Sequence, residues 1–246
     1  MNKYLIHVDT AEQTMVTAGP NVQASVSKVN GNPFQCTVIL GNRHRAIREV
    51  KLKNVQMPVA FYNIRAPYNT MNVNSIIYTI TPGNYTADSL RLALNSAYGP
   101  TVGTFSIASL TNIVTFASAS GSATMNVTTP SILSVFGFAP GVSIGTTIVA
   151  PYSYLANFDT YVSIWIENLG PSSLEPSPVT FKVPITAPSG SIMHWTENTQ
   201  DDQVIRVTDR GVRLDRLNIQ VIDRFGTIIN NNGVDWSFTL EILADT

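Results

Sequence analysis

Residues 214–243, LDRLNIQVIDRFGTIINNNGVDWSFTLEIL, determine the fold class of this chain. Apolar and polar side chains alternate along Leu217–Val221, and the same alternation returns along Trp236–Ile242. Because successive side chains of a strand point to opposite sides of a sheet, each run predicts a strand with one apolar face. Asn231-Asn232-Gly233 predicts a turn between them, so we expect a hairpin. Its apolar face needs a second layer, which indicates a β-sandwich or barrel.

The composition limits the classes of function. The chain has 246 residues, of which 44% are hydrophobic, enough for a full core. Charged residues make up 13%, about half of the roughly 25% usual in soluble domains. So few charges are typical of a surface that neighbouring molecules cover, and equally of a β protein whose outer faces carry Thr, Ser and Asn. The net charge of −1 argues against direct binding of nucleic acid, which depends on a basic surface.

The single cysteine, Cys36, allows neither an intrachain disulfide nor a zinc site made of thiolates. The first residues lack the apolar core of a secretory signal, and no stretch approaches the roughly 20 apolar residues of a membrane helix. We therefore expect synthesis in a reducing compartment and no membrane span.

Turn-forming Gly, Pro and Asn residues divide the chain into three predicted parts. Residues 9–33 are poor in bulky apolar groups, and residues 1–33 are predicted to form an N-terminal arm that docks on its own subunit or on a neighbour. An ordinary first strand at Tyr4–Val8, followed by a long loop, is the alternative. Residues 34–80 and 151–246 are predicted to form the β domain, with about eight strands, the number in a jelly roll. These strands are expected at 34–40, 46–55, 73–80, 161–166, 179–185, 203–207, 215–221 and 234–243.

Residues 81–150 interrupt the strand pattern and predict a small α+β insertion. Thr86 is a suitable N-cap for a helix whose apolar residues Leu90, Leu94 and Ala97 recur at helical spacing up to Gly99-Pro100. Short strands are expected at 104–108, 112–117 and 124–128, followed by a second helix at 132–136 that Gly137 ends.

Residues suited to catalysis or metal binding do not form a recognisable pattern. His7, His44 and His194 lie in unrelated segments without a second ligand at metal spacing. The pair Asp201-Asp202 lacks the spacing of a calcium loop, and Cys36 lies in an apolar run where a thiol acts as a small hydrophobic group. Motifs of nucleotide-binding proteins and serine hydrolases are also missing, so we expect no enzyme activity, no metal and no cofactor.

Charged pairs near the C-terminus are the candidate subunit interface. Arginines and aspartates alternate in this region, and their bidentate pairs would fix the orientation of two subunits. Charges that protect an edge strand from aggregation would give the same pattern. The candidate residues are Arg210, Arg213, Asp215, Arg216, Asp223 and Arg224.

A set of short motifs gives the chain a resemblance to a known family. They are Met57-Pro58, Phe61-Tyr62-Asn63-Ile64, Tyr78-Thr79-Ile80, Pro82-Gly83-Asn84-Tyr85, Leu94-Asn95, Leu133, Phe136-Gly137-Phe138, Leu217-Asn218-Ile219, Asp223-Arg224-Phe225-Gly226 and Trp236-Ser237-Phe238-Thr239-Leu240. In this order they resemble the penton-type single jelly-roll capsid proteins of virophages, Polinton-like viruses and large double-stranded-DNA viruses. The resemblance extends over roughly residues 34–246.

This resemblance implies an all-β fold, a single jelly-roll β-sandwich with the α+β insertion as an outward decoration or an added subunit contact. It implies a homopentamer at the vertex of an icosahedral capsid, assembled in the host cell. Its partners would be further copies of itself, the hexameric double jelly-roll major capsid protein and minor capsid proteins. Two alternatives remain open: a minor or cement capsid protein with the same fold, and a viral attachment module that binds glycans through aromatic residues such as Tyr152, Tyr154, Trp165 and Trp195.

Overall fold

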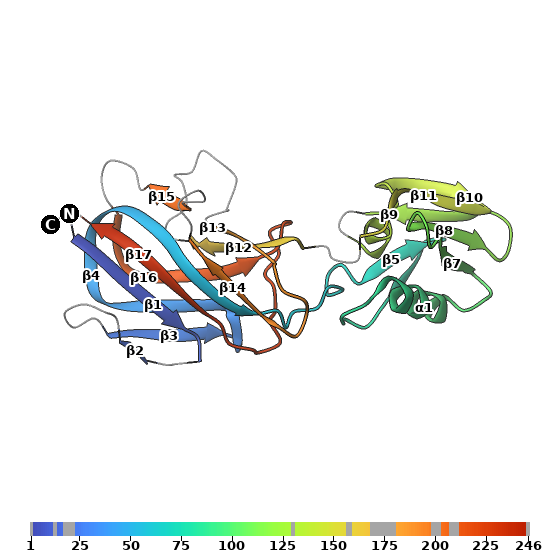
Figure 1. Cartoon of the computed structure of the whole chain (residues 1–246). Helices are drawn as coiled ribbons and strands as arrows, with labels where there is room; N and C mark the ends of the chain where they lie inside the picture. Colours follow the sequence, from blue (N-terminus) through green and yellow to red (C-terminus); the bar gives the residue numbers. More distant parts are fainter. Residues whose placement is uncertain are drawn as a thin grey trace. The chain divides into compact units, whose positions relative to one another are not determined.

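The computed structural model describes residues 2–11, 14–16, 23–128, 131–155, 159–167, 181–197, 203–206 and 212–244. The chain divides into two compact units. Unit 1 combines residues 1–61 and 159–246, and unit 2 comprises residues 62–158. Antiparallel strands make up most of the described chain (Figure 1), as expected for an all-β protein. The inserted unit starts earlier and ends later than the predicted 81–150.

Unit 1 has the strand order of a single jelly roll. Its strands are β1 (Asn2–Asp9), β2 (Thr14–Val16), β3 (Gln23–Val29), β4 (Asn32–Pro58), β12 (Tyr161–Ile166), β13 (Phe181–Pro184), β14 (Ile192–Thr196), β15 (Val204–Arg206), β16 (Val212–Ile222) and β17 (Ser237–Ala244). Eight strand positions pair like a long hairpin folded over on itself. The first position pairs with the eighth, the second with the seventh, the third with the sixth and the fourth with the fifth.

The bent strand β4 supplies two of these eight positions. Its first half pairs with β16 from Gln35 to Ile39, and its second half pairs with β17 from Ile47 to Gln56. The register with β16 shifts twice between Ile39 and Ile47, where β4 passes from one layer to the other. The first position, β1, pairs with the eighth, β17. The third position, the second half of β4, pairs with the sixth, which β14 and β15 form together. The fourth position, β12, pairs with the fifth, β13.

Two layers result. Layer I contains β1, β17, the second half of β4, and β14 with β15; layer II contains the first half of β4, β16, β12 and β13, extended by β3 and β2. The inward side chains of both layers share one hydrophobic core. Ile6 and Val8 of β1, for example, are 1% and 0% exposed, as are Ile219 and Val221 of β16.

Two predictions about unit 1 are wrong. The segment 214–243 does form two strands with one apolar face each, but they do not pair as a hairpin, because the two halves of β4 pair with them in different layers. The described part of the predicted arm docks on its own subunit, because β1 pairs along its whole length with β17 and β3 pairs with β4 of the same chain. The strand expected at Tyr4–Val8 lies within β1. The predicted strand 73–80 belongs to unit 2, so β1 fills the place that it leaves among the eight.

Both connections to unit 2 leave unit 1 at the same end. Asn2 pairs with Ala244 and Ala244 with Ile47, so both chain ends lie beside the bend of β4. Pro58 and the start of β12 lie at the opposite end of the strands, since Ser163 pairs with Ile222 whereas Val212 pairs with Ile47. Asn2 and Ala244 therefore lie at one end of the jelly roll, and the two connections to unit 2 leave from the other end.

Unit 2 has its own core between two sheets. The four-stranded sheet has the order β10-β9-β5-β6, and the three-stranded sheet has the order β11-β8-β7. Their strands are β5 (Thr70–Val73), β6 (Ile76–Thr79), β7 (Gly103–Ile107), β8 (Ile113–Ser118), β9 (Ala123–Val127), β10 (Gly141–Gly145) and β11 (Thr147–Ser153). Side chains from both sheets and both helices form one buried cluster. An independent core explains why this segment is a unit and not a loop.

Two capped helices complete unit 2. Helix α1 (Ala87–Tyr98) begins at Thr86, whose hydroxyl accepts a hydrogen bond from the Ser89 N–H, and α2 (Ile132–Val135) begins at Ser131 in the same way. Both helices and strands β7, β8 and β9 are where the sequence predicted them. The apolar face of α1 differs in one position, because Tyr98 is buried and Ala97 is exposed. No helix in the described residues has the length and apolar character needed to cross a membrane.

Candidate assembly interface

The six predicted interface residues do not gather at one place. Arg210 lies outside the described residues, and so does the side chain of Arg213 in β16. Asp215 and Arg216 are exposed near the start of β16, with 3.5 Å between Asp215 Oδ1 and Arg216 Nε. Asp223 and Arg224 follow the other end of this strand. The interface role of the set stays a prediction.

Asp223 stabilises a turn of its own chain. Its carboxylate accepts hydrogen bonds from the N–H groups of Phe225 (2.8 Å) and Thr227 (2.9 Å), and the residue is only 2% exposed. Arg224 is exposed, with its guanidinium carbon 4.6 Å from the ring centre of Phe225. The sequence could not separate Asp223 from Asp215, because both are aspartates beside an arginine and only the turn distinguishes them.

A polar connection at the open edge of the sandwich joins β1 to the segment before β17. Thr10 Oγ1 donates a hydrogen bond to Asp235 Oδ1 (2.8 Å) and accepts one from the Trp236 N–H (3.0 Å). Lys28 Nζ lies 2.6 Å from the same Asp235 oxygen. Because Thr10 is 2% exposed, these contacts fix the end of β1 and link β3 to layer I.

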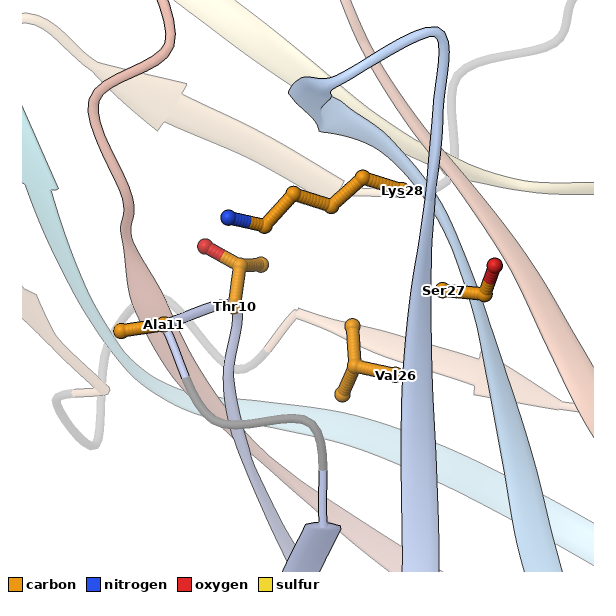
Figure 2. Close-up of a pocket in the computed structure, with 5 residues that line it drawn as sticks. All are labelled: Thr10, Ala11, Val26, Ser27 and Lys28. Atoms are coloured by element: carbon orange, nitrogen blue, oxygen red, sulfur yellow. The ribbon is translucent and has the colours of Figure 1, made fainter.

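The same edge holds a depression of about 460 Å³. It is lined by Thr10, Ala11, Val26, Ser27 and Lys28. Lys28 and Thr10 point toward one another across it, while Ser27 points to the other side of β3 (Figure 2). The ammonium of Lys28 is neutralised by Asp235, so the depression offers hydrogen-bonding groups without a net charge.

A shallow groove of about 210 Å³ lies on layer II, and the polar residues Gln35, Thr37, Glu167, Asn218 and Gln220 are among those that line it. Thr37 Oγ1 donates to Asn218 Oδ1 (3.1 Å), and Asn218 Nδ2 donates to Glu167 Oε2 (3.0 Å). Gln35 and Gln220 are opposite each other two residues further along the same pair of strands. These side chains had no predicted role, although the alternation of Asn218 and Gln220 with apolar residues places them on the outer side of β16.

The predicted candidates for chemistry are spread over the molecule. His7 Nδ1 lies 3.1 Å from Thr239 Oγ1, and His194 is exposed in β14. The side chain of His44 and the residues Asp201 and Asp202 lie outside the described part of the chain. Burial raises the pKa of the Cys36 thiol to about 12, opposed in part by Lys28, so the thiol stays neutral. Within the described part of the chain, no group of three or more His, Cys, Asp or Glu side chains could hold a metal ion.

The four aromatic candidates for glycan binding do not share a site. Tyr152 and Tyr154 belong to β11 and the residue after it in unit 2, where Tyr152 is 63% exposed and Tyr154 packs against the core. Trp195 packs against the core of unit 1 from β14, and Trp165 lies on β12, paired with Gln220. None of the four lines either depression described above.

The similarity of this chain to known proteins is one of structure and not of sequence. No family model matches the chain, and no curated protein matches its sequence. Among solved structures, the chain is similar to the crystal structure of the mavirus penton protein, with 10% identity, a TM-score of 0.40 and all of both chains covered. At this identity and TM-score the match carries no argument about function, and the assignment of an all-β jelly roll rests on the strand pairings of unit 1.

Proposed function

We propose that this chain is a structural capsid protein that forms a closed homopentamer, the capsomer at the vertex of an icosahedral double-stranded-DNA virus. The observation that carries the proposal is the strand order of unit 1, a complete single jelly roll in one copy. The order of short motifs that resembles penton-type capsid proteins supports it. A fold alone does not define a function, so assembly is the property to measure.

In this proposal the mechanism is geometric and no reaction is catalysed. Closed cyclic symmetry requires each subunit to present one side that fits the opposite side of the next subunit. In an upright jelly roll, Asn2 and Ala244 would point toward one surface of the shell and the two connections to unit 2 would leave toward the other, since they lie at opposite ends of the strands of unit 1. The surrounding partner would be the hexameric double jelly-roll major capsid protein.

The N-terminal segment bears on the alternative of a cement protein. That alternative was favoured by an arm that threads between capsomers, but residues 2–9 pair within their own sheet. A vertex capsomer therefore explains the described N-terminal strand more directly.

The decisive experiment is the mass of the purified chain in solution, measured by light scattering, together with a rotational average of negative-stain images. We expect five copies and fivefold symmetry. A strict monomer at high micromolar concentration would overturn the proposal and leave the cement or attachment protein.

Charge reversal tests the predicted interface residues against a matched control. Arg216→Glu should weaken the pentamer without lowering the melting temperature, because the side chain is 59% exposed and lies beside Asp215. Arg91→Glu is the control, since Arg91 pairs in the same way with Asp88 on α1 (3.4 Å). Equal effects of both substitutions on the pentamer would contradict a specific role of Arg216.

A further inference from the structure

Unit 2 is almost free of charge. From Leu92 to Phe158 the sequence contains no Asp, Glu, Lys, Arg or His, and unit 2 as a whole has only Arg65, Asp88 and Arg91. Arg65 is 7% exposed, and the other two form an ion pair on α1. Both sheets of unit 2 therefore present outer surfaces without any charged group.

These two outer surfaces carry small polar and aliphatic side chains. The first, the four-strand face, consists of the outward residues of β5, β6, β9 and β10, and the second, the three-strand face, consists of those of β7, β8 and β11. The registers place Thr70, Asn72, Ile77, Thr79, Thr124, Asn126, Val142 and Ile144 on the four-strand face, and Thr104, Ser106, Thr115, Ala117, Thr147 and Val149 on the three-strand face. Each face points away from the core of unit 2, because the inward residues of both sheets share that core.

Exposed aliphatic residues distinguish these faces from an ordinary Thr- and Ser-rich surface. Ile77, Val142 and Ile144 are 67%, 62% and 69% exposed on the four-strand face, and Val149 is 57% exposed on the three-strand face. The edge strands β6 and β10 also lack the lysine, proline or inward charge that usually protects an edge from pairing with another chain. A surface of this kind is favourable when another molecule covers it.

The absence of charge on these two faces indicates which kind of molecule covers them. Like charges that meet across an interface between two copies repel one another and weaken the contact. Two neutral faces avoid this repulsion, whereas a partner with a charged surface would lose hydration without gaining an ion pair. A second copy of unit 2 is therefore the occupant whose surface matches.

The size of the faces shows that this contact supplements another. Four strands spaced about 4.8 Å apart, five residues long at about 3.3 Å each, cover roughly 300 Å². A stable interface needs about 800 Å² on each partner. The contact can form only between copies already held together, where the effective concentration is high.

We propose that, in the assembled ring, the four-strand face of unit 2 packs on the three-strand face of unit 2 in the next copy. This inference rests on the proposed function, because a closed ring needs two different faces on each subunit. Unit 2 has two such faces, each pointing away from the shared core, and neither face carries a charge.

Single charges placed on each face test this inference. Asn126→Lys places a cation at the centre of the four-strand face, between Asn72 and Val142, and Ala117→Glu places an anion on the three-strand face, between Thr104 and Thr147. Each should raise the concentration at which the pentamer dissociates by about tenfold or more, and the double variant should restore it. Leu110→Lys is the control, because Leu110 is 97% exposed in a turn outside both faces and should leave the pentamer unchanged.

The possible results separate the two proposals. A pentamer that neither single variant weakens would overturn the contact between units 2 and leave the proposed function intact. If Asn126→Lys weakens the pentamer but Ala117→Glu does not, the four-strand face packs on a surface other than the three-strand face, and the proposed pairing is overturned. A parent protein that is monomeric would overturn the proposed function itself. Circular dichroism melting of each variant verifies that a lost pentamer does not reflect unfolding.

Discussion

At the scale of the residue, Trp236 connects both layers of the jelly roll. Its indole N–H donates a hydrogen bond to the Pro33 carbonyl (2.8 Å). Its ring meets Phe34 edge-on at 5.6 Å and stacks on Phe238 at 4.6 Å between centres. The period-2 alternation of the last strand predicted this core position, and the exposure of 2% confirms it. The hydrogen bond to Pro33 has no signal in the sequence, because the two residues are distant along the chain.

Substitution of Trp236 should separate packing from hydrogen bonding. We expect Trp236→Ala to lower the free energy of unfolding by about 3–5 kcal/mol, because it removes buried surface and leaves a cavity. Trp236→Phe keeps most of the ring contact but leaves the Pro33 carbonyl unpaired, so its cost should be about 1–3 kcal/mol. Urea unfolding followed by circular dichroism measures both. The control is Thr239→Ala on the outer face, where only the hydrogen bond to Asn54 (3.1 Å) and the contact with His7 are lost. A larger loss for Thr239→Ala than for Trp236→Ala would reverse the assignment of faces.

Cys36 should make the stability of unit 1 depend on pH above 9. Burial raises the pKa of its thiol from 9.0 to about 12, so the folded chain keeps a proton that the unfolded chain loses in this range. Since the folded state then binds more protons, the free energy of unfolding falls as the pH rises from about 9 toward 12, by at most about 1.4 kcal/mol per pH unit. Urea unfolding at pH 8 and pH 10 measures the decrease. Cys36→Ala should show a smaller decrease, and an equal decrease in both proteins would exclude Cys36 as its source.

At the scale of the element, the strands were more predictable than their partners. Strands β16 and β17 have clear alternation, and both pack on the predicted core. Their assignment to different layers depends on β4, whose 27 residues bend so that each half pairs with one of them. Alternation specifies which side of a strand is buried, and the same pattern suits any partner with an apolar face. The predicted strand 73–80 failed for a related reason, since Asn74 and Ser75 adopt positive φ angles and turn the chain between β5 and β6.

Removal of the insertion tests where its boundaries lie. Replacing residues 62–158 by a short Gly/Ser linker should leave a jelly roll that unfolds cooperatively, because every strand pair of unit 1 remains. Replacing only 81–150 removes β9, which pairs with β5, and exposes Met71 and Val73, which are now 3% and 0% exposed. That shorter deletion should aggregate. Thermal melting and light scattering distinguish the two, and a well-folded 81–150 deletion would contradict the boundaries at 62 and 158.

At the scale of the whole molecule, two separate cores predict two unfolding transitions. The core of unit 1 and the core of unit 2 have no residue in common. Calorimetry of the full chain should therefore show two transitions. Trp236→Ala should lower only one of them, and Phe116→Ala, at a residue 0% exposed in unit 2, should lower only the other. A single transition that both substitutions shift would mean that the units unfold together.

Alternation, capping residues and turn residues act between near neighbours, so the sequence was sufficient to predict both helices and strands such as β12, β16 and β17 with their buried faces. Strands β3 and β14 were not predicted, and the predicted strand 73–80 is divided between β5 and β6. The pairing of β1 with β17, the separation of β16 and β17 into different layers, and the turn that Asp223 closes while Asp215 stays exposed could be seen only in the folded chain. These features depend on contacts between residues far apart in the chain, where several pairings bury a similar apolar surface. The bend of β4 and the shared core select one of them.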